Sequence, residues 1–312
     1  MHIPDGFLSA GVAASTWTLG AGSLAWALRA EKTLADRTPA GTLGALAAFV
    51  FAGQLVNLPL LPGTSGHLVG GTLAAAIVGP WRGLVVMAVV LAVQALLFQD
   101  GGITAFGANL LAMGGAGALG GHAVAAFVAR LRPGVRGLVA GSVIGAFVAT
   151  LVGAAFIAMA LAASGLYPAT LALPVMLSFH VPIALVEAAL TGAILATLVR
   201  WRPDIVRGLQ RAREGPAPAL GLLVVALAVA AFVAPFASPF PDALESVAER
   251  LGFAEAARGL WPAPAPDYPL QWLALGRAST ALAGVVGTLA AAALAWGLTR
   301  RLAAPRGLEP HG

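Results

Sequence analysis

Two of the five histidines, His2 and His67, are of the type and placement that could bind one metal ion together. The chain begins MHIPDGFLSA, so the α-amine of Met1, the amide nitrogen of His2 and its imidazole Nδ1 can close two fused chelate rings around an ion. His67, in the segment NLPLLPGTSGHLVGG, could supply a fourth nitrogen. A planar set of four nitrogens favours Ni(II) or Cu(II), and imidazole also suits Co(II), whereas zinc prefers a tetrahedral site.

The alternative is that these two histidines have no metal-binding role. His2 would then be an unstructured end of the chain, and His67 a loop residue hydrogen-bonded to the backbone. The chelate also requires Met1 to keep a free amine. The N-terminus has neither a positive n-region nor an early cleavage site, so no removable signal peptide is expected. The bulky His2 should also discourage removal of Met1 by aminopeptidases.

Further polar residues could orient the ligands, because metal-bound histidines usually need a hydrogen-bond partner on the second ring nitrogen. The candidates are Asn57, Gln94, Asp100, Asn109 and His180. His180 and Glu187 are seven residues apart on one apolar run and should face the protein interior, since both are costly in lipid. A plain interhelical hydrogen bond is the alternative for His180. His122 is expected to pack between helices, and His311 to have no role.

Several kinds of chemistry are excluded. The chain has no cysteine, so thiolate metal sites, disulfides and thiol catalysis are absent. Its one lysine, Lys32, does not belong to a phosphate-binding G-x-x-x-x-G-K-[ST] loop, so no bound nucleotide is expected. An intramembrane metalloenzyme would need a motif such as H-E-x-x-H, which the sequence lacks. Basic residues form short clusters between apolar runs, which argues against nucleic-acid binding.

The elements that must position these residues are membrane helices. Of the 312 residues, 59% are hydrophobic and only 10% are charged, whereas soluble domains carry roughly 25% charged residues. A bilayer core needs roughly 20 apolar residues per helix. We predict an all-α, polytopic membrane helix bundle of about nine transmembrane helices, seven plus two. The expected spans are 11–28, 42–60, 68–79, 83–98, 104–129, 137–163, 174–199, 219–237 and 276–299.

Basic residues predict the orientation of this bundle, because they gather in cytoplasmic loops. With the N-terminus outside and the C-terminus cytoplasmic, only Arg250, Arg258 and Arg277 among the 18 basic residues lie outside. His2 and His67 then lie at the same, outer face. The long outer loop over 238–275 should hold a helix beginning at Asp242, with Glu245 completing a capping box.

The motifs MHIPDGFLS, NLPLLPGTSGHLVGG, LLFQDGGITAFGAN and SFHVPIALVEA occur in order within residues 1–200. This region resembles the substrate-binding component (CbiM/NikM family) of the nickel and cobalt energy-coupling-factor (ECF) transporters. The resemblance implies seven spans and a metal held by Met1, His2 and His67. It also implies an ECF transmembrane coupling protein and two ATP-binding subunits as partners in the cell inner membrane.

Residues 219–303 resemble the small partner subunit of these transporters, of the PDGLE (NikN) type. The evidence is PDALE at 241–245, APDY at 265–268 and STALAGVVGTL at 279–289, with alanine in place of the glycine of PDGLE. An arginine-rich cytoplasmic linker, 201–218, should join the two regions. The expected function is capture of Ni²⁺ or Co²⁺ as a transported substrate, without enzymatic activity. A self-sufficient divalent-metal permease is the alternative, and the sequence does not separate nickel from cobalt.

Overall fold

The computed structural model describes residues 1–33, 38–207, 217–268 and 276–303. Part of the expected linker, including Arg211 and Arg213, lies outside these residues, as do Arg306 and His311. The α-helices are α1 (Ala10–Thr33), α2 (Ala40–Gln54), α3 (Gly71–Val78), α4 (Pro80–Val93), α5 (Phe106–Asn109), α6 (Gly121–Leu131), α7 (Val135–Ala163), α8 (Ala169–Trp201), α9 (Ala217–Ala228), α10 (Ala243–Leu251) and α11 (Arg277–Ala303).

Wider and tighter helical turns extend several of these helices. The π-helical segments are η1 (Gln94–Phe98), η2 (Leu110–Gly120) and η4 (Val229–Val233), and the 3₁₀ segments are η3 (Pro203–Ile205), η5 (Ala234–Phe236) and η6 (Ala254–Ala256). Strands β1 (Leu58–Leu61) and β2 (Thr64–Gly66) form an antiparallel hairpin in which Leu58 pairs with Gly66. The predicted helical membrane architecture is therefore confirmed, with one hairpin that the sequence did not predict.

Among the residues that the structure describes, six helical segments are long and apolar enough to cross a membrane: 80–98, 106–131, 135–163, 169–201, 219–236 and 277–301. Each coincides with an expected span. The expected span 11–28 lies in α1, 42–60 runs from α2 into β1, and 68–79 contains α3. The eight residues of α3 extend about 12 Å and cannot cross a hydrocarbon core of about 30 Å alone. The number nine and the orientation therefore stay predictions.

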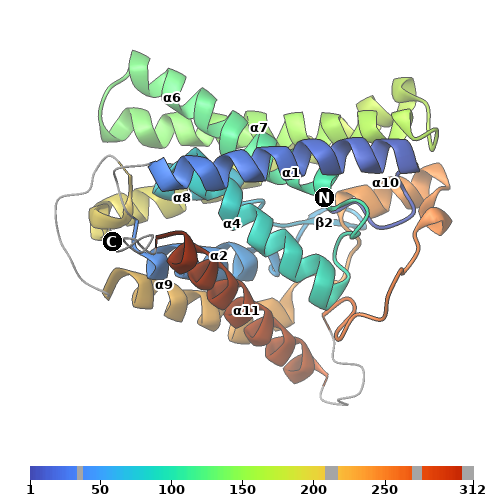
Figure 1. Cartoon of the computed structure of the whole chain (residues 1–312). Coiled ribbons are helices and arrows are strands. Elements are labelled where there is room, and N and C mark those ends of the chain that lie inside the picture. The colour runs from blue at the N-terminus through green and yellow to red at the C-terminus, as the bar shows by residue number, and fades with distance from the viewer. Residues whose placement is uncertain (34–37, 208–216, 269–275, 304–312) are drawn as a thin grey trace, which may run out of the picture.

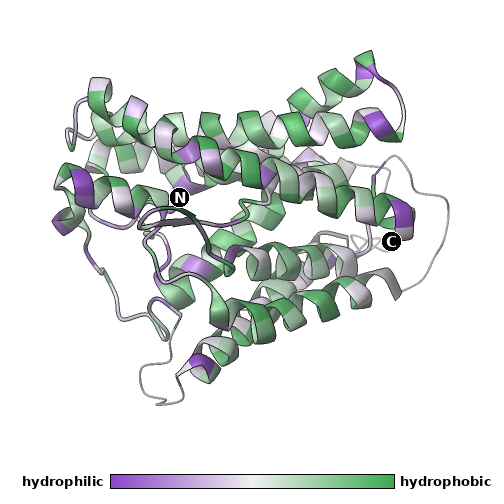
Figure 2. Ribbon diagram, turned by 180° about the vertical axis from the view of Figure 1, so that it is seen from behind, coloured by the Kyte–Doolittle hydropathy of each residue, from purple (hydrophilic) through white to green (hydrophobic). Residues whose placement is uncertain are grey.

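The outer faces of the long helices are apolar. Phe127 on α6, Leu185 on α8 and Phe232 in η4 are each more than half exposed. Figure 2 shows hydrophobic residues along the lengths of the helices and hydrophilic ones gathered mainly near their ends. Exposed apolar side chains of this size need lipid around them, so the chain is an integral, multi-pass membrane protein.

Helix α2 lies inside the bundle, packed against α4 on one side and against α9 and α11 on the other (Figure 1). Eleven of its fifteen residues are buried. The helices that follow the linker therefore cover an apolar helix of the first region. Figure 1 also shows the N-terminus and α10 toward the end of the bundle opposite to the C-terminal end of α11.

Helix α3 packs closely on η2 because both present glycine at the crossing. A Cβ added at Gly71 would lie 2.5 Å from the Met113 carbonyl oxygen, and one at Gly117 would lie 3.1 Å from the Gly71 Cα. Gly70, directly before α3, adopts φ +81°, a conformation that side-chain-bearing residues rarely take. These glycines let the chain turn from an extended segment into α3 within the protein.

The orientation can be tested by cysteine labelling, because the chain has no cysteine of its own. Glu249 on α10 and Arg132 between α6 and α7 are both exposed. With the N-terminus outside, Glu249→Cys should react with a membrane-impermeant maleimide in intact cells, and Arg132→Cys only after the membrane is breached. The reverse pattern would invert the bundle, and labelling of both in intact cells would overturn the span count.

Candidate metal centre

The first residues of the chain are buried in the protein. Met1 and His2 are 5% and 7% exposed, and Ile3 is fully buried. Asn109, at the end of α5, accepts a hydrogen bond from the Ile3 N–H at 2.8 Å and donates one to the Ile3 carbonyl at 3.0 Å. The Gly102 N–H also donates to the Ile3 carbonyl at 2.8 Å. Both polar backbone groups of Ile3 are thereby paired, which fixes the two residues before it.

Asp5 ties this segment to the loop between η1 and α5. Its carboxylate accepts hydrogen bonds from the backbone N–H groups of Ile103, at 3.1 Å, and Thr104, at 2.7 Å, and from the Thr104 hydroxyl. On the other side, the Arg258 N–H donates to the Asp5 carbonyl at 2.8 Å. The N-terminal segment is thus held between the first region and the loop after α10.

His2 and His67 come together although 64 residues separate them in the sequence. Their rings stack with centroids 5.4 Å apart and planes 18° from parallel. The His67 Nδ1–H donates to the Leu68 carbonyl at 2.9 Å, which directs the other ring nitrogen, Nε2, away from the backbone. Burial lowers the pKa of His67 to about 4, so the ring is neutral near pH 7 and keeps a lone pair on Nε2. His67 can therefore donate a hydrogen bond to the backbone through Nδ1 and still be available as a metal ligand through Nε2.

The extended segment after His67 is fixed by two side chains from helices. Glu187 on α8 accepts the N–H groups of Val69 at 2.6 Å and Gly70 at 2.9 Å. Gln54, at the end of α2, donates to the Val69 carbonyl at 2.7 Å and accepts a hydrogen bond from Gln94 at 2.7 Å. Non-helical backbone within a membrane protein must find such partners, because lipid offers none.

Asp242 faces the Met1 amine. The ammonium donates to Asp242 Oδ2, while Oδ1 accepts the Glu245 N–H at 2.9 Å and Glu245 accepts the Asp242 N–H at 2.8 Å. The predicted capping box is therefore confirmed. Burial would raise the pKa of Asp242, but the ammonium and these hydrogen bonds hold it well below its ordinary value. The charge of Asp242, together with burial, raises the pKa of Glu245 to about 7.

A second carboxylate holds the His2 ring. Asp100 Oδ1 lies 2.9 Å from His2 Nδ1, and Asp100 Oδ2 accepts a hydrogen bond from the Tyr268 hydroxyl at 2.5 Å. Burial would raise the pKa of Asp100, but His2 and the Tyr268 hydroxyl hold it well below its ordinary value. Burial, with the charge of Asp100, raises the pKa of Tyr268. Both Tyr268 and Asp242 come from the region after the linker.

The five residues predicted to orient the ligands make different contacts in the structure. Asp100 contacts His2, Asn109 binds Ile3, and Gln94 acts through Gln54. Asn57 lines the cavity beside the histidines. His180 donates from Nδ1 to the Met176 carbonyl of its own helix at 2.7 Å, and its Nε2 has no hydrogen-bond partner among the described residues. Sequence reasoning missed the site contacts of Gln54, Asp242 and Tyr268.

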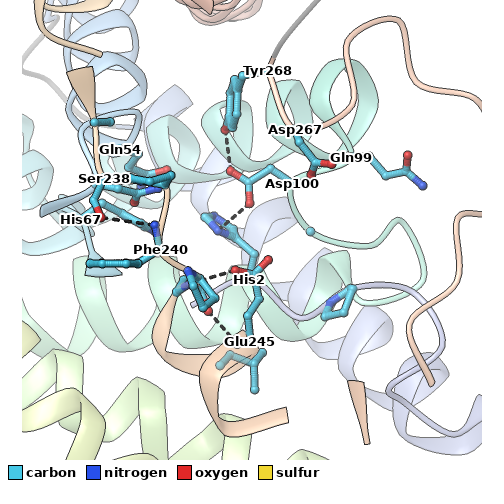
Figure 3. Close-up of a pocket in the computed structure, with 18 of the residues that line it drawn as sticks. His2, Gln54, His67, Gln99, Asp100, Ser238, Phe240, Glu245, Asp267 and Tyr268 are labelled. Carbon is cyan, nitrogen blue, oxygen red and sulfur yellow. Dashed lines mark hydrogen bonds and ion pairs between the residues drawn. The ribbon is translucent and has the colours of Figure 1, made fainter. Parts of the chain in front are cut away.

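A cavity of about 870 Å³ opens beside this cluster (Figure 3). Its lining includes His2 and His67, and the acidic residues there are Asp100, Asp242, Glu245, Glu249 and Asp267. No lysine or arginine lines it among the residues the structure describes. One ligand atom each from His2, His67 and Asp242 lies within 4.8 Å of the others, which makes this group a candidate metal site.

Fold and site together define a multi-pass helical membrane protein with a buried cluster of potential metal ligands at its N-terminus. Residues 2–205 match the family described as the cobalt uptake substrate-specific transmembrane region, and residues 217–304 match the PDGLE domain. The chain belongs to this cobalt-uptake family and carries a PDGLE domain after it, as the sequence motifs indicated.

Full-length relatives have the same two-part organisation. A putative fused nickel transport protein from Archaeoglobus fulgidus is 34% identical over 96% of this chain and 98% of its own length. A fused nickel transport protein from Rhodobacter capsulatus is also 34% identical, over 96% of this chain and 99% of its own. A crystal structure of a truncated transition metal transporter superposes with a TM-score of 0.59 at 29% identity, covering 64% of this chain and 99% of that one.

Asn109 clamps the Ile3 backbone through two hydrogen bonds, and the effect of removing this clamp can be predicted. Asn109→Ala leaves two buried backbone groups with fewer partners, which should destabilise the protein by about 1–3 kcal/mol. Metal affinity should fall roughly 10- to 100-fold, as for other ligand-orienting residues. Titration calorimetry and thermal unfolding in detergent measure both. Ser164→Ala, which removes a hydroxyl bonded to its own helix, is the control, and wild-type affinity in Asn109→Ala would contradict the clamp.

Proposed function

We propose that this chain is the metal-binding component of an ECF-type, ATP-driven importer of Ni²⁺ or Co²⁺. It captures the ion at the extracytoplasmic face in a nitrogen site made by the Met1 amine, the His2 amide and Nδ1, and His67. The observation that carries the proposal is the burial of the N-terminal amine beside two stacked histidines. A chain end is ordered only where contacts hold it, and the burial of this one supports a ligand role for its amine beside the two histidines.

In the described conformation, both chelating groups of the N-terminus have carboxylate partners. The Met1 amine is paired with Asp242, and His2 Nδ1 is paired with Asp100. Chelation requires both to exchange these partners for the ion, and the Met1 ammonium and the His2 amide each lose a proton to solvent. Asp100 and Asp242 then remain beside the bound ion. His67, neutral and oriented by Leu68, needs no such change.

The names of the relatives support nickel or cobalt as the cargo, since these proteins are called nickel transport and cobalt transport proteins. Transport energy has to come from elsewhere, because the chain has no phosphate-binding loop. We propose a transmembrane coupling protein and two ATP-binding subunits as partners in the cell inner membrane. Glu187, the carboxylate that a self-sufficient permease could use, already binds Val69 and Gly70 with both oxygens.

His2→Ala and His67→Ala should each abolish high-affinity binding of nickel and cobalt, because each removes an imidazole from the same ion. The variants should remain folded in detergent and inserted in the membrane. His122→Gln is the matched control, since His122 lies on α6 and does not line the metal-site cavity. Metal content after gel filtration measures the outcome. Wild-type retention of both metals by either alanine variant would refute the site.

The Met1 amine is the ligand that separates this site from an ordinary pair of histidines. Inserting one residue between Met1 and His2, or blocking the amine with an acetyl or formyl group, should remove stoichiometric nickel binding. Insertion displaces the amine from the chelate ring, and blocking removes its basic lone pair. A pair of surface histidines would tolerate both changes. The measurement compares metal content of the native chain with a version carrying an uncleaved N-terminal tag, and equal content would make Met1 a bystander.

A further inference from the structure

Asp242 lies at the boundary between the cavity and the buried histidines. It lines the cavity and is one of the three residues whose ligand atoms lie within 4.8 Å of one another. Ligand atoms bound to one ion at roughly 2.0–2.2 Å stand about 3.4 Å apart in a tetrahedral arrangement. The three residues therefore need to approach by little more than 1 Å to share an ion. Each oxygen of Asp242 already accepts one hydrogen bond and keeps a second lone pair for a ligand role.

In this conformation the free ring nitrogen of His2 is not the one that the proposed nitrogen site uses. His2 Nδ1 is held by Asp100, whereas His2 Nε2 is buried and has no partner among the described residues. His67 Nδ1 is held by Leu68, which leaves Nε2. The Met1 amine donates to Asp242 and offers no lone pair there. His2, His67 and Asp242 line the cavity and Met1 does not, so an ion in the cavity reaches these three residues before the amine.

We propose that Asp242, with His2 and His67, forms a capture site that binds the divalent ion before the four-nitrogen site assembles. This inference rests on the proposed function and adds a ligand from the region after the linker. The ion replaces the Met1 ammonium as the cationic partner of Asp242, and the released ammonium loses one proton to solvent to become the amine ligand. The His2 ring then turns to present Nδ1, and the ion passes to the chelate. Asp242 is therefore a transient oxygen ligand and also determines when the amine becomes available.

The orientation of Asp242 is built into α10. Its Oδ1 accepts the Glu245 N–H, so the carboxylate is fixed at the helix N-terminus. The strand that precedes His67 is bound to the same segment: the Ser65 N–H donates to the Pro241 carbonyl at 2.9 Å, and the Ser65 hydroxyl donates to the Phe240 carbonyl at 2.7 Å. The Thr64 hydroxyl donates to the Ser246 hydroxyl at 2.9 Å. These hydrogen bonds fix the positions of Asp242 and His67 relative to each other.

Asp242→Asn tests this assignment, because asparagine is an equally good N-cap and should preserve α10 while removing the anionic ligand. Purified apo-protein is mixed with Ni(II), and its loading is followed by stopped-flow absorption. We expect Asp242→Asn to load roughly tenfold more slowly and to reach the same final spectrum as wild type. Glu249→Gln, which removes a charge from the same helix and cavity, should load at close to the wild-type rate. Thermal unfolding verifies that both variants are folded.

Equal or faster loading of Asp242→Asn would overturn the proposal. If Asp242 only restrained the Met1 amine, removing its charge would make the amine more available and would not slow loading. Equal slowing by Glu249→Gln would also overturn it, since the effect would then be general electrostatic attraction. A chain with an acetylated N-terminus gives the second test. It should bind Co(II) weakly with the intense visible absorption of four-coordinate cobalt, and Asp242→Asn should remove that absorption. Failure of wild type to bind nickel or cobalt would instead refute the proposed function.

Discussion

A buried ammonium group needs an anionic partner, because an unpaired charge inside a protein is strongly unfavourable. The Met1 amine is buried, and Asp242 provides that partner. The pairing joins the first residue of the chain to the first turn of α10, which lies beyond the linker. Three other features are consistent with this ion pair. They are the position of the PDGLE-type region over the N-terminus, the packing of β2 on Phe240 and Pro241, and the shape of the cavity.

The second constraint is the extended backbone around His67. A hairpin and a short helix flank His67, and the extended backbone between them has N–H and C=O groups that lipid cannot satisfy. Glu187 and Gln54 bind them from two different helices. These hydrogen bonds offset the cost of burying the polar backbone groups. They also fix the position of the segment that follows His67.

Much of the site could be predicted from sequence, because its chemistry is local. A free amine followed by histidine is a chelator by covalent connectivity alone, and the six long apolar helices lie where hydropathy places them. The expected span 68–79 does contain a helix, α3, but only eight of its residues are helical, since hydropathy counts apolar residues without distinguishing helix from extended backbone. Asp242 contacts Met1 across 241 positions of the sequence, and Tyr268 contacts Asp100 across 168 positions. No periodicity or spacing in one sequence encodes such pairs.

The two carboxylates beside the N-terminus help to meet two opposing requirements of a metal-binding site. A site that holds Ni²⁺ or Co²⁺ tightly must be dry and enclosed, but an ion leaves water only where other ligands replace its hydration shell. Asp242 and Asp100 pair the Met1 amine and His2 Nδ1 and hold them in position. Because Tyr268 fixes Asp100 and the α10 capping box fixes Asp242, both carboxylates are controlled by the region after the linker. Fusing the two regions keeps these controlling residues beside the N-terminus that we propose as the chelating group.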